Sequence, residues 1–556
     1  MKKPFRMLLL LLLLGAGEAL YASTPQNAGK ALPRPKLVVG IVIDQMRWDY
    51  LYRYYDRYGE GGFRRFLSEG VSCENTMITH LPAYTGVGHA TIYTGTTPAV
   101  HGIAANDFTI QKTGEAVYCV EDSTAEPVGT SSASCRMSPR NLLASTVTDE
   151  LRIGTQFRSK VISVSLKDRA AILPAGHAAN GAYWFDSSTG RFISSSWYVE
   201  KLPGWLEDFN KQDRPRALMQ GKWETLYAPE TYTASTPDDT PYETPYFEGE
   251  RPVLPVDMER LLKEKGYESV KSLPAGNTLT LELARAAIAG EQLGQRGATD
   301  FLAVSCSSTD YVGHQFGPDA VETEDTYLRL DRDLAAFFAY LDQTVGKGQY
   351  TVFLTADHAG TNNLSFQQDH KLPVGGFSPA RAGKMLRDSL QARYGRTDLI
   401  RGISNYQVVL NYDALRAGKI NKERLKRQLI GWLADYPHVA YVVDQTRTAD
   451  ASIPEVLREK IRNGYYPKRS GEIQIIVEPG CFDTNEEGAY KGTSHGTWNP
   501  QDSHIPLLFM GWGIEPVGRL FREVHMTDIA PTIATLLRIQ MPNGCIGQTI
   551  PEVLKQ

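Results

Sequence analysis

Apolar and polar positions alternate along the chain in blocks that match buried strands and amphipathic helices. Six short runs of mainly apolar, β-branched residues are typical of strands buried on both faces of a parallel sheet. These runs lie at 37–43, 161–166, 301–306, 351–354, 473–477 and 505–510. Between them, stretches such as 323–341 repeat apolar residues with helical spacing. The alternation predicts an α/β fold with a mostly parallel central sheet and helices on both faces.

Two long stretches interrupt this alternation, at about 180–273 and about 399–468. The first is rich in tyrosine, proline, threonine and acidic residues, whereas the second has strand-like and helical patterns of its own. We expect both to be insertions that project from the sheet, because loops and added elements commonly build the ligand sites of such folds. The prediction is therefore one domain over 30–556 that carries two inserted subdomains.

The N-terminal segment 1–22 has the composition of a secretory signal peptide. Lys2, Lys3 and Arg6 precede an apolar run over 7–17, and small residues follow up to Ala22. The alternative is a membrane anchor, but this run is much shorter than the roughly 20 apolar residues of a spanning helix. We expect export to the periplasm, possibly secretion, and no membrane span.

Charge and cysteine content narrow the function classes further. The net charge of −4 comes without a clustered basic excess, so we expect no nucleic-acid partner. Six cysteines in an exported chain permit disulfides, and their pairing stays open because six cysteines allow 15 connectivities. Cys119 and Cys135 are the favoured pair, whereas Cys306 lies in an apolar run and is expected to be a buried thiol. The oligomeric state is also open, with a monomer favoured.

Ligand-type side chains follow four of the predicted strands at the point where each strand ends. Asp44 follows the first, Lys167 and Arg169 the second, the segment with Asp310 and His314 the third, and Asp357-His358 the fourth. Ligands bind beyond the carboxyl ends of the strands in open parallel sheets, so we expect these residues to share one site. The i,i+4 spacing of Asp310 and His314 puts both on one face if that segment is helical.

Carboxylates and imidazoles in this pattern indicate a metal centre. His495, beside Gly492 and Gly496, is a further candidate ligand. Taken alone, a strand-end Asp is more often a helix cap and a lone histidine is more often structural. The joint occurrence at four strand ends favours ligation, and the ligand number suits the two-metal arrangement of phosphoryl displacement.

Two further groups fit an anionic substrate. Lys167 and Arg169 would point to the same side of an extended segment and could grip a phosphoryl group, although a solvated strand end is the ordinary explanation for such a pair. Thr85 is followed by Gly86 and Gly88, which could let a phosphate approach the backbone at the start of a helix. Thr85 is therefore the candidate nucleophile.

The whole set of motifs resembles the alkaline phosphatase superfamily, and most closely its exported PafA-type, flavobacterial branch. The resemblance covers most of the mature chain, through TGVGHATIYTG, GIAANDF, SLKDR, TDYVGH, TADH and SHGT in that order. It implies two Zn²⁺ ions, small phosphorylated substrates, and transfer of the phosphoryl group to a threonine before water releases inorganic phosphate. It implies no dedicated magnesium site.

The resemblance also implies a role for each motif residue. One zinc would be held by Asp310, His314 and His495, and the other by Asp44, Asp357 and His358 with Thr85 as its reactive ligand. Asn106 would contact a phosphoryl oxygen. Lys167 and Arg169 match the pair that separates these monoesterases from related phosphodiesterases.

Three other readings remain open at this point. A phosphodiesterase of the same superfamily is the alternative enzyme, and Lys167 with Arg169 argues against it. A sulfatase would need a cysteine or serine in a C/S-x-P-x-R context, which no cysteine of this chain has. An exported binding protein or pseudo-enzyme would carry structural zinc, but such sites usually have four protein ligands, whereas the first cluster offers three.

Overall fold

The core of the protein is an 11-stranded sheet whose central strands are parallel. In this computed structural model, which describes residues 33–132, 135–485 and 490–555, the sheet order is β19–β2–β20–β12–β1–β11–β6–β7–β8–β5, with β21 paired to β2. The strands are β1 (Leu37–Ile43), β2 (Gly70–Met77), β5 (Pro127–Val128), β6 (Val161–Ser165), β7 (Gly181–Asp186), β8 (Arg191–Ser195), β11 (Asp300–Cys306), β12 (Tyr350–Thr355), β19 (His504–Ile505), β20 (Leu507–Gly511) and β21 (Gly518–His525). All residues of β1, β6, β11 and β12 are buried, as expected for strands covered on both faces.

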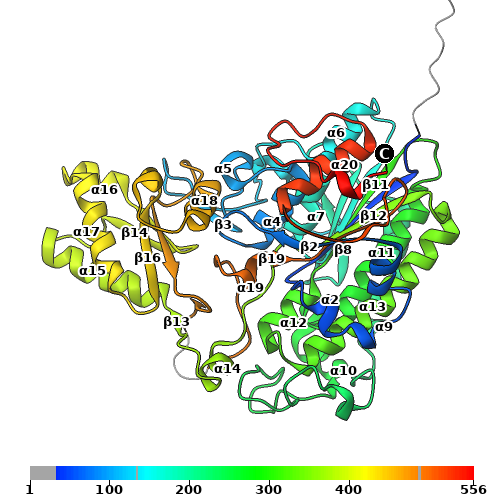
Figure 1. Cartoon of the computed structure of the whole chain (residues 1–556), viewed down its shortest axis with the longest axis horizontal. Coiled ribbons are helices and arrows are strands. Elements are labelled where there is room, and N and C mark those ends of the chain that lie inside the picture. The colour runs from blue at the N-terminus through cyan, green and yellow to red at the C-terminus, as the bar shows by residue number, and fades with distance from the viewer. Residues whose placement is uncertain (1–32, 133–134, 486–489, 556) are drawn as a thin grey trace, which may run out of the picture. The chain divides into compact units, whose positions relative to one another are not determined.

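Helices cover both faces of this sheet (Figure 1). One group packs together as α4 (Thr85–Thr94), α6 (Val147–Gly154), α7 (Asp168–Ala175) and α20 (Ile529–Leu537). The other consists of α3 (Phe63–Glu69), α8 (Gly204–Lys211), α11 (Pro274–Glu291), α12 (Ser308–Phe316) and α13 (Val321–Leu341). The predicted α/β fold with helices on both faces of a central sheet is confirmed. The sheet is mixed, with parallel strands in its centre and antiparallel pairings toward both ends.

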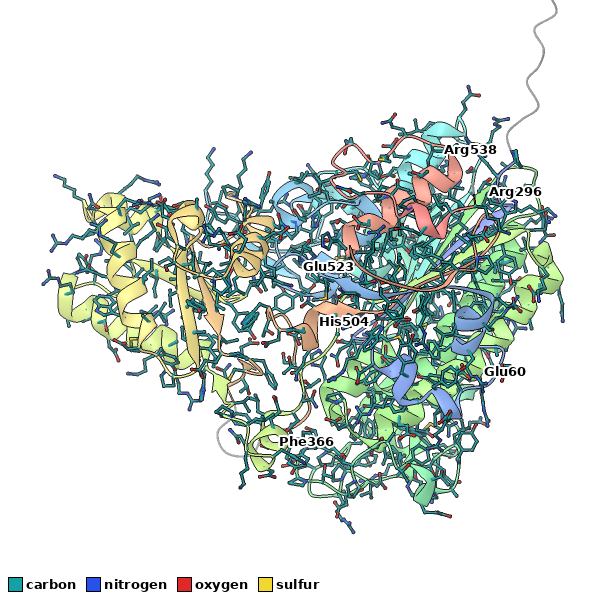
Figure 2. All side chains as sticks on the ribbon, in the orientation of Figure 1. Glu60, Arg296, Phe366, His504, Glu523 and Arg538 are labelled. Carbon is teal, nitrogen blue, oxygen red and sulfur yellow. The ribbon has the colours of Figure 1, made fainter. Side chains whose placement is uncertain are left out.

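A second hydrophobic cluster lies outside the central sheet, in residues that follow β12 in the chain. Its four-stranded sheet has the order β14 (Ile400–Ser404), β15 (Gln407–Leu410), β17 (Ile473–Val477), β16 (Val439–Asp444), and it is antiparallel. Helices α15 (Pro379–Tyr394), α16 (Tyr412–Ala417) and α17 (Lys422–Ala434) pack with it, and β13 (Gly376–Phe377) pairs with β18 (Phe482–Asp483). Phe366, on α14 (Leu364–Asp369), marks the segment that leads from the central sheet to this unit (Figure 2).

Shorter elements complete the described chain. They are α2 (Tyr50–Arg53), α5 (Pro98–His101), β3 (Asp107–Thr109), β4 (Ala116–Tyr118), α9 (Arg214–Leu218), β9 (Lys222–Trp223), β10 (Val256–Asp257), α10 (Met258–Lys265), α18 (Glu455–Gly464) and α19 (Pro500–Ser503), besides single 3₁₀ and π turns. Within the three described ranges, no helix combines the length and apolar character needed to cross a bilayer. The predicted signal peptide 1–22 lies outside the described residues.

Three expectations from the sequence are wrong. The run 473–477 is a strand of the second sheet, and 505–510 contributes an antiparallel strand, β20, to the central one. An apolar run predicts that a strand is buried, but it does not predict which strand pairs with it or whether the pairing is parallel. Cys119 is a buried free thiol, so the favoured pair with Cys135 is not formed, whereas Cys306 is the buried thiol that was expected.

Candidate functional site

The four strands that end in polar residues are direct neighbours in the order β12–β1–β11–β6. They are parallel and in register, with Ile43 beside Cys306, so the residues that follow them emerge at the same edge of the sheet. Asp44 follows β1, α12 follows β11, Asp357 lies just beyond β12, and Lys167 lies just beyond β6. The expectation that these strand ends converge is confirmed.

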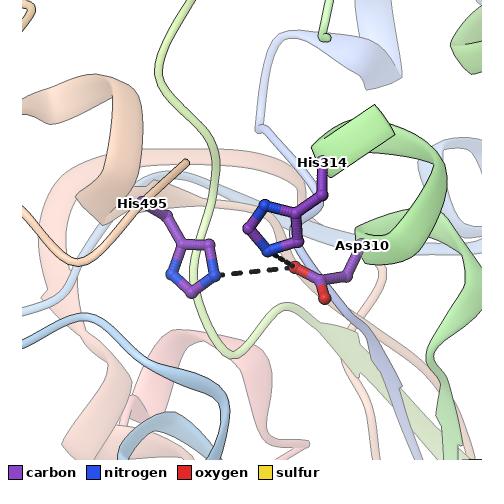
Figure 3. Close-up of side chains that lie close together, drawn as sticks. All are labelled: Asp310, His314 and His495. Atoms are coloured by element: carbon purple, nitrogen blue, oxygen red, sulfur yellow. Dashed lines mark ion pairs between the residues drawn. The ribbon is translucent and has the colours of Figure 1, made fainter. Parts of the chain in front are cut away.

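Asp310, His314 and His495 form the first cluster of ligand-type side chains (Figure 3). Asp310 and His314 lie one turn apart on α12, so the helix expected for their i,i+4 spacing is present. The Asp310 Oδ1 atom is 3.2 Å from His314 Nε2 and 3.6 Å from His495 Nε2. Each ring places Nδ1 against a backbone carbonyl, at 2.9 Å for Thr493 and 2.8 Å for Ala83. These contacts fix the tautomer that keeps a lone pair on Nε2, as in metal-ligating histidines.

Asp44, Asp357 and His358 form the second cluster with the Thr85 hydroxyl. His358 Nε2 lies 3.4 Å from Asp44 Oδ1, 3.7 Å from Asp357 Oδ2 and 3.4 Å from Thr85 Oγ1. Its Nδ1 faces the Ala359 carbonyl at 3.0 Å. The two clusters adjoin, because ligand atoms of Asp44, Asp310 and His358 lie within 4.8 Å of one another. The His358 and His495 rings stack with their centroids 3.5 Å apart.

Lys167 supplies the positive charge between the two clusters. Its Nζ lies 2.7 Å from Asp44 Oδ2 and 2.5 Å from Asp310 Oδ2. Burial raises the pKa of Asp44 well above its usual value, and the carboxylates of Asp310 and Asp357 add to this shift. Burial alone would also raise the pKa of Asp310, but His314 and Lys167 hold it well below the usual value. The site therefore holds more buried negative charge than Lys167 balances.

Unpaired oxygens test whether this site fits cations. Asp44 Oδ1 and Asp357 Oδ2 are buried and have no hydrogen-bond donor among the described residues. A buried carboxylate without compensation costs several kcal/mol, so such oxygens usually face a counter-ion. Burial lowers the pKa of both His358 and His495, which favours the neutral imidazole that binds metals. The donor set of carboxylates and imidazoles therefore fits divalent metal ions.

Thr85 is the first residue of α4, so the helix expected at this position is present. All ten residues of the helix are buried. A Cβ at Gly88 would lie 2.2 Å from the Asp357 carbonyl oxygen, so this glycine lets α4 pack directly on the loop that carries Asp357 and His358. The packing of α4 on this loop therefore accounts for a glycine at position 88 without a phosphate.

Asn106 and Arg169 lie beside the start of α4. Asn106 Oδ1 accepts the Gly86 backbone N–H at 2.8 Å. Arg169 is the second residue of α7, so the extended geometry expected for Lys167 and Arg169 is wrong; only Lys167 is extended. Both side chains nevertheless line one pocket of about 330 Å³, together with Trp184.

Three neighbouring side chains that were not among the expected site residues also contribute to the site. His89 Nδ1 lies 3.3 Å from Asp357 Oδ2, and Gln45 Nε2 donates to Asp310 Oδ1 at 2.7 Å. The Tyr118 hydroxyl donates to Asp168 at 2.5 Å and accepts from Arg169 Nη1 at 3.0 Å. Tyr118 comes from β4, outside the quoted motifs, and only the tertiary fold brings it to Arg169.

Comparisons with known proteins agree with this geometry. Residues 38–498 match the family model described as type I phosphodiesterase / nucleotide pyrophosphatase. A protein of Myroides odoratus named calcium-transporting ATPase is 52% identical, over 95% of this chain and 96% of its own. The alkaline phosphatase PhoV of Synechococcus elongatus is 51% identical, over 96% of this chain and 95% of its own.

The alkaline phosphatase PafA of Elizabethkingia meningoseptica is 48% identical, over 94% of this chain and 95% of its own. The crystal structure of PafA superposes with a TM-score of 0.92, covering 95% of this chain and 100% of that one. The structure of a PafA variant in which a threonine, an asparagine, a lysine and an arginine are substituted together gives a TM-score of 0.91.

Proposed function

Because the chain belongs to the PafA-type alkaline phosphatases of the type I phosphodiesterase / nucleotide pyrophosphatase family and is a phosphatase, we propose that it is an exported, zinc-dependent phosphomonoesterase. It would release inorganic phosphate through a phosphothreonine at Thr85. The observation that carries this proposal is the Thr85 hydroxyl, buried at the start of α4 and 3.4 Å from His358 Nε2. The PafA variant named above supports the choice of residues, since the same four types occur here in the same order as Thr85, Asn106, Lys167 and Arg169.

We propose two Zn²⁺ ions per chain. Asp310, His314 and His495 would hold one; Asp44, Asp357 and His358, with Thr85, would hold the other. The unpaired oxygens of Asp44 and Asp357 and the nitrogen-oxygen donor set support this assignment. When bound, zinc supplies Lewis acidity, which lowers the pKa of a hydroxyl nucleophile and neutralises charge on phosphoryl oxygens.

Thr85 is proposed to act as the nucleophile of the first step. The Thr85 hydroxyl proton passes to water as Oγ1 forms a bond to phosphorus and the bond from phosphorus to the leaving oxygen breaks. The leaving alkoxide takes a proton from water and departs as the alcohol. Water then attacks the phosphothreonine, orthophosphate leaves, and the Thr85 hydroxyl is restored. The N-terminus of α4 favours the anion throughout, because the helix dipole is positive there.

Asn106, Lys167 and Arg169 are proposed to bind the oxygens of the transferred group. Asn106 uses its Oδ1 to hold the Gly86 N–H, which leaves its amide NH₂ as a donor. The Arg169 Nε is buried without a hydrogen-bond acceptor among the described residues, so this atom keeps a donor for a phosphoryl oxygen. A monoester dianion carries one more negative charge than a diester. The positive charges of Lys167 and Arg169 compensate this additional charge, so the site suits the monoester better.

Tyr118 is expected to position Arg169 rather than to contact the substrate. Tyr118→Phe removes the hydroxyl between Arg169 and Asp168, so kcat/KM for a monoester should fall about two- to tenfold, as for one hydrogen bond of about 0.5–1.5 kcal/mol. Tyr198→Phe is the matched control, since Tyr198 bonds the Gly176 carbonyl at the other end of α7. In an Arg169→Ala background the Tyr118 effect should vanish, and an unchanged effect would contradict the positioning role.

We also propose that segment 1–22 directs export and that the stretches 180–273 and 399–468 are insertions. Its substrates would be small phosphate esters, with broad acceptance of the leaving group. Thr85, Asn106, Lys167 and Arg169 are assigned to the transferred group, and no residue is assigned to the rest of the substrate.

The experiment that tests the function compares an aryl phosphate monoester with the matching diester. Metal-free protein is titrated with zinc, and both hydrolysis rates are measured against zinc bound per chain. The expected result is strong monoester preference that reaches its maximum when the two proposed catalytic positions are filled. Diester preference would establish the phosphodiesterase alternative instead. Absence of turnover of either ester with zinc bound would support the alternative of a pseudo-enzyme with structural zinc.

A further inference from the structure

A second set of ligand-type side chains lies in the four-stranded unit, away from the two clusters described above. His438, Glu478 and Cys481 each place one ligand atom within 4.8 Å of the other two. The sheet register accounts for two of them. Val439 of β16 pairs with Val477 of β17, so His438 and Glu478 are the next residues on the two strands. The Glu478 N–H donates to the His438 carbonyl at 3.0 Å, and His438 Nδ1 lies 3.2 Å from Glu478 Oε2.

A tight turn brings Cys481 to the same place. The Cys481 N–H donates to the Glu478 carbonyl at 3.1 Å, and Gly480 takes the left-handed conformation that this turn requires, with φ of 76°. The Cys481 side chain is buried, and its Sγ accepts the Gly375 N–H at 3.2 Å. Backbone N–H donors of this kind stabilise a thiolate, and they are common around metal-bound sulfur.

The His438 ring is held in place from two directions. His438 has φ of 60°, a left-handed conformation that costs a non-glycine residue about 1 kcal/mol or more. A Cβ at Gly375 would lie 2.1 Å from His438 Nε2, so the ring packs against the backbone whose N–H binds Cys481. The surrounding fold therefore fixes the imidazole beside the sulfur.

We propose that His438, Glu478 and Cys481 form a binding site for a thiophilic divalent cation, with Zn²⁺ as the natural occupant. Thiolate and imidazole donors select zinc over calcium or magnesium, which take oxygen ligands. On binding, the Cys481 thiol loses its proton to water and the sulfur takes the metal. Three protein ligands leave one tetrahedral position for a water molecule. The ion would join the adjacent ends of β16 and β17 to the turn that carries Cys481 before β18.

Cobalt substitution tests this site with a signal that the proposed catalytic centre cannot give. The catalytic ligands are carboxylates, imidazoles and a hydroxyl, so only a cysteine site gives a thiolate-to-cobalt charge-transfer band in the near ultraviolet. The full chain, loaded with Co²⁺, should show this band, and Cys481→Ser should abolish it while phosphatase activity is retained. Cys545→Ser is the matched control, because Cys545 is the least buried cysteine of the described chain, and it should keep the band.

Absence of the band from the unmodified protein, or its persistence in Cys481→Ser, would overturn the proposal. His438→Ala keeps the thiol and tests the second ligand. It should weaken Co²⁺ binding at this site by about tenfold or more, since loss of even an outer-sphere partner costs 10–100-fold. Unchanged affinity would remove His438 from the site. Because the readout is the sulfur-metal band, the result is independent of whether the proposed catalytic function holds.

Discussion

Thr85→Ala is expected to lower kcat/KM for an aryl phosphate monoester by about 10³–10⁶-fold, as when other enzymes lose a covalent nucleophile. The substitution removes the only hydroxyl placed 3.4 Å from His358 Nε2 among the described hydrogen bonds, while the six carboxylate and imidazole ligands stay in place. Zinc content should therefore equal that of the unmodified protein. The measurement is steady-state kinetics combined with metal analysis of the same sample.

Thr94→Ala is the matched control for this substitution. Thr94 is the last residue of the same buried helix, and its hydroxyl bonds the Ala90 carbonyl. Its loss should change stability far more than activity. Thr85→Ser should retain a phosphorylated enzyme intermediate, because the hydroxyl is kept. If Thr85→Ala retained activity within tenfold of the unmodified protein, the covalent route would be excluded.

Arg169→Ala is expected to change the substrate preference as well as the rate. The monoester rate should fall by about 10²–10³-fold, the usual loss for a donor to developing negative charge, whereas the diester rate should fall much less. The ratio of the two kcat/KM values, measured at one zinc occupancy, is the decisive quantity. Arg169 is the cleaner choice for this test, because Lys167 also balances Asp44 and Asp310.

A control substitution separates specific from general charge effects. Arg140→Ala removes a cation that pairs with Asp122 and has a side chain 59% exposed, so both rates should stay unchanged. Equal losses of monoester and diester hydrolysis in Arg169→Ala would contradict the assignment of Arg169 to the additional charge of a monoester.

The sequence predicted the strands and the ligand-type residues that follow them because both are local features. The runs before Asp44, Asp310 and Asp357 are buried strands, and their ends meet as expected for a parallel sheet. Pairing is not local, which is why 473–477 and 505–510 were assigned to the wrong sheet or direction. Apolar composition is the same in either case.

The rest of the site depends on contacts that no spacing encodes. Tyr118 reaches Arg169, and His89 reaches Asp357, only after strands and helices distant in sequence have packed. The sequence predicts that Gly88 leaves space beside α4, with a phosphate as the expected neighbour. In the structure its neighbour is the Asp357 backbone. A glycine in a sequence shows that space is needed, and only the structure shows what occupies it.

The proposed metal ligands are also synthesised at very different times. Asp44 is among the first residues of the described chain to leave the ribosome, whereas His495 follows after eight of the eleven strands of the central sheet and the whole four-stranded unit. Chains fold from the N-terminus during synthesis, so the sheet edge forms while one ligand cluster still lacks a member. A nascent or prematurely ended chain can therefore contain α4 with Thr85 and much of the fold while it lacks His495. The proposed ligand set is completed only when the last part of the polypeptide has been made.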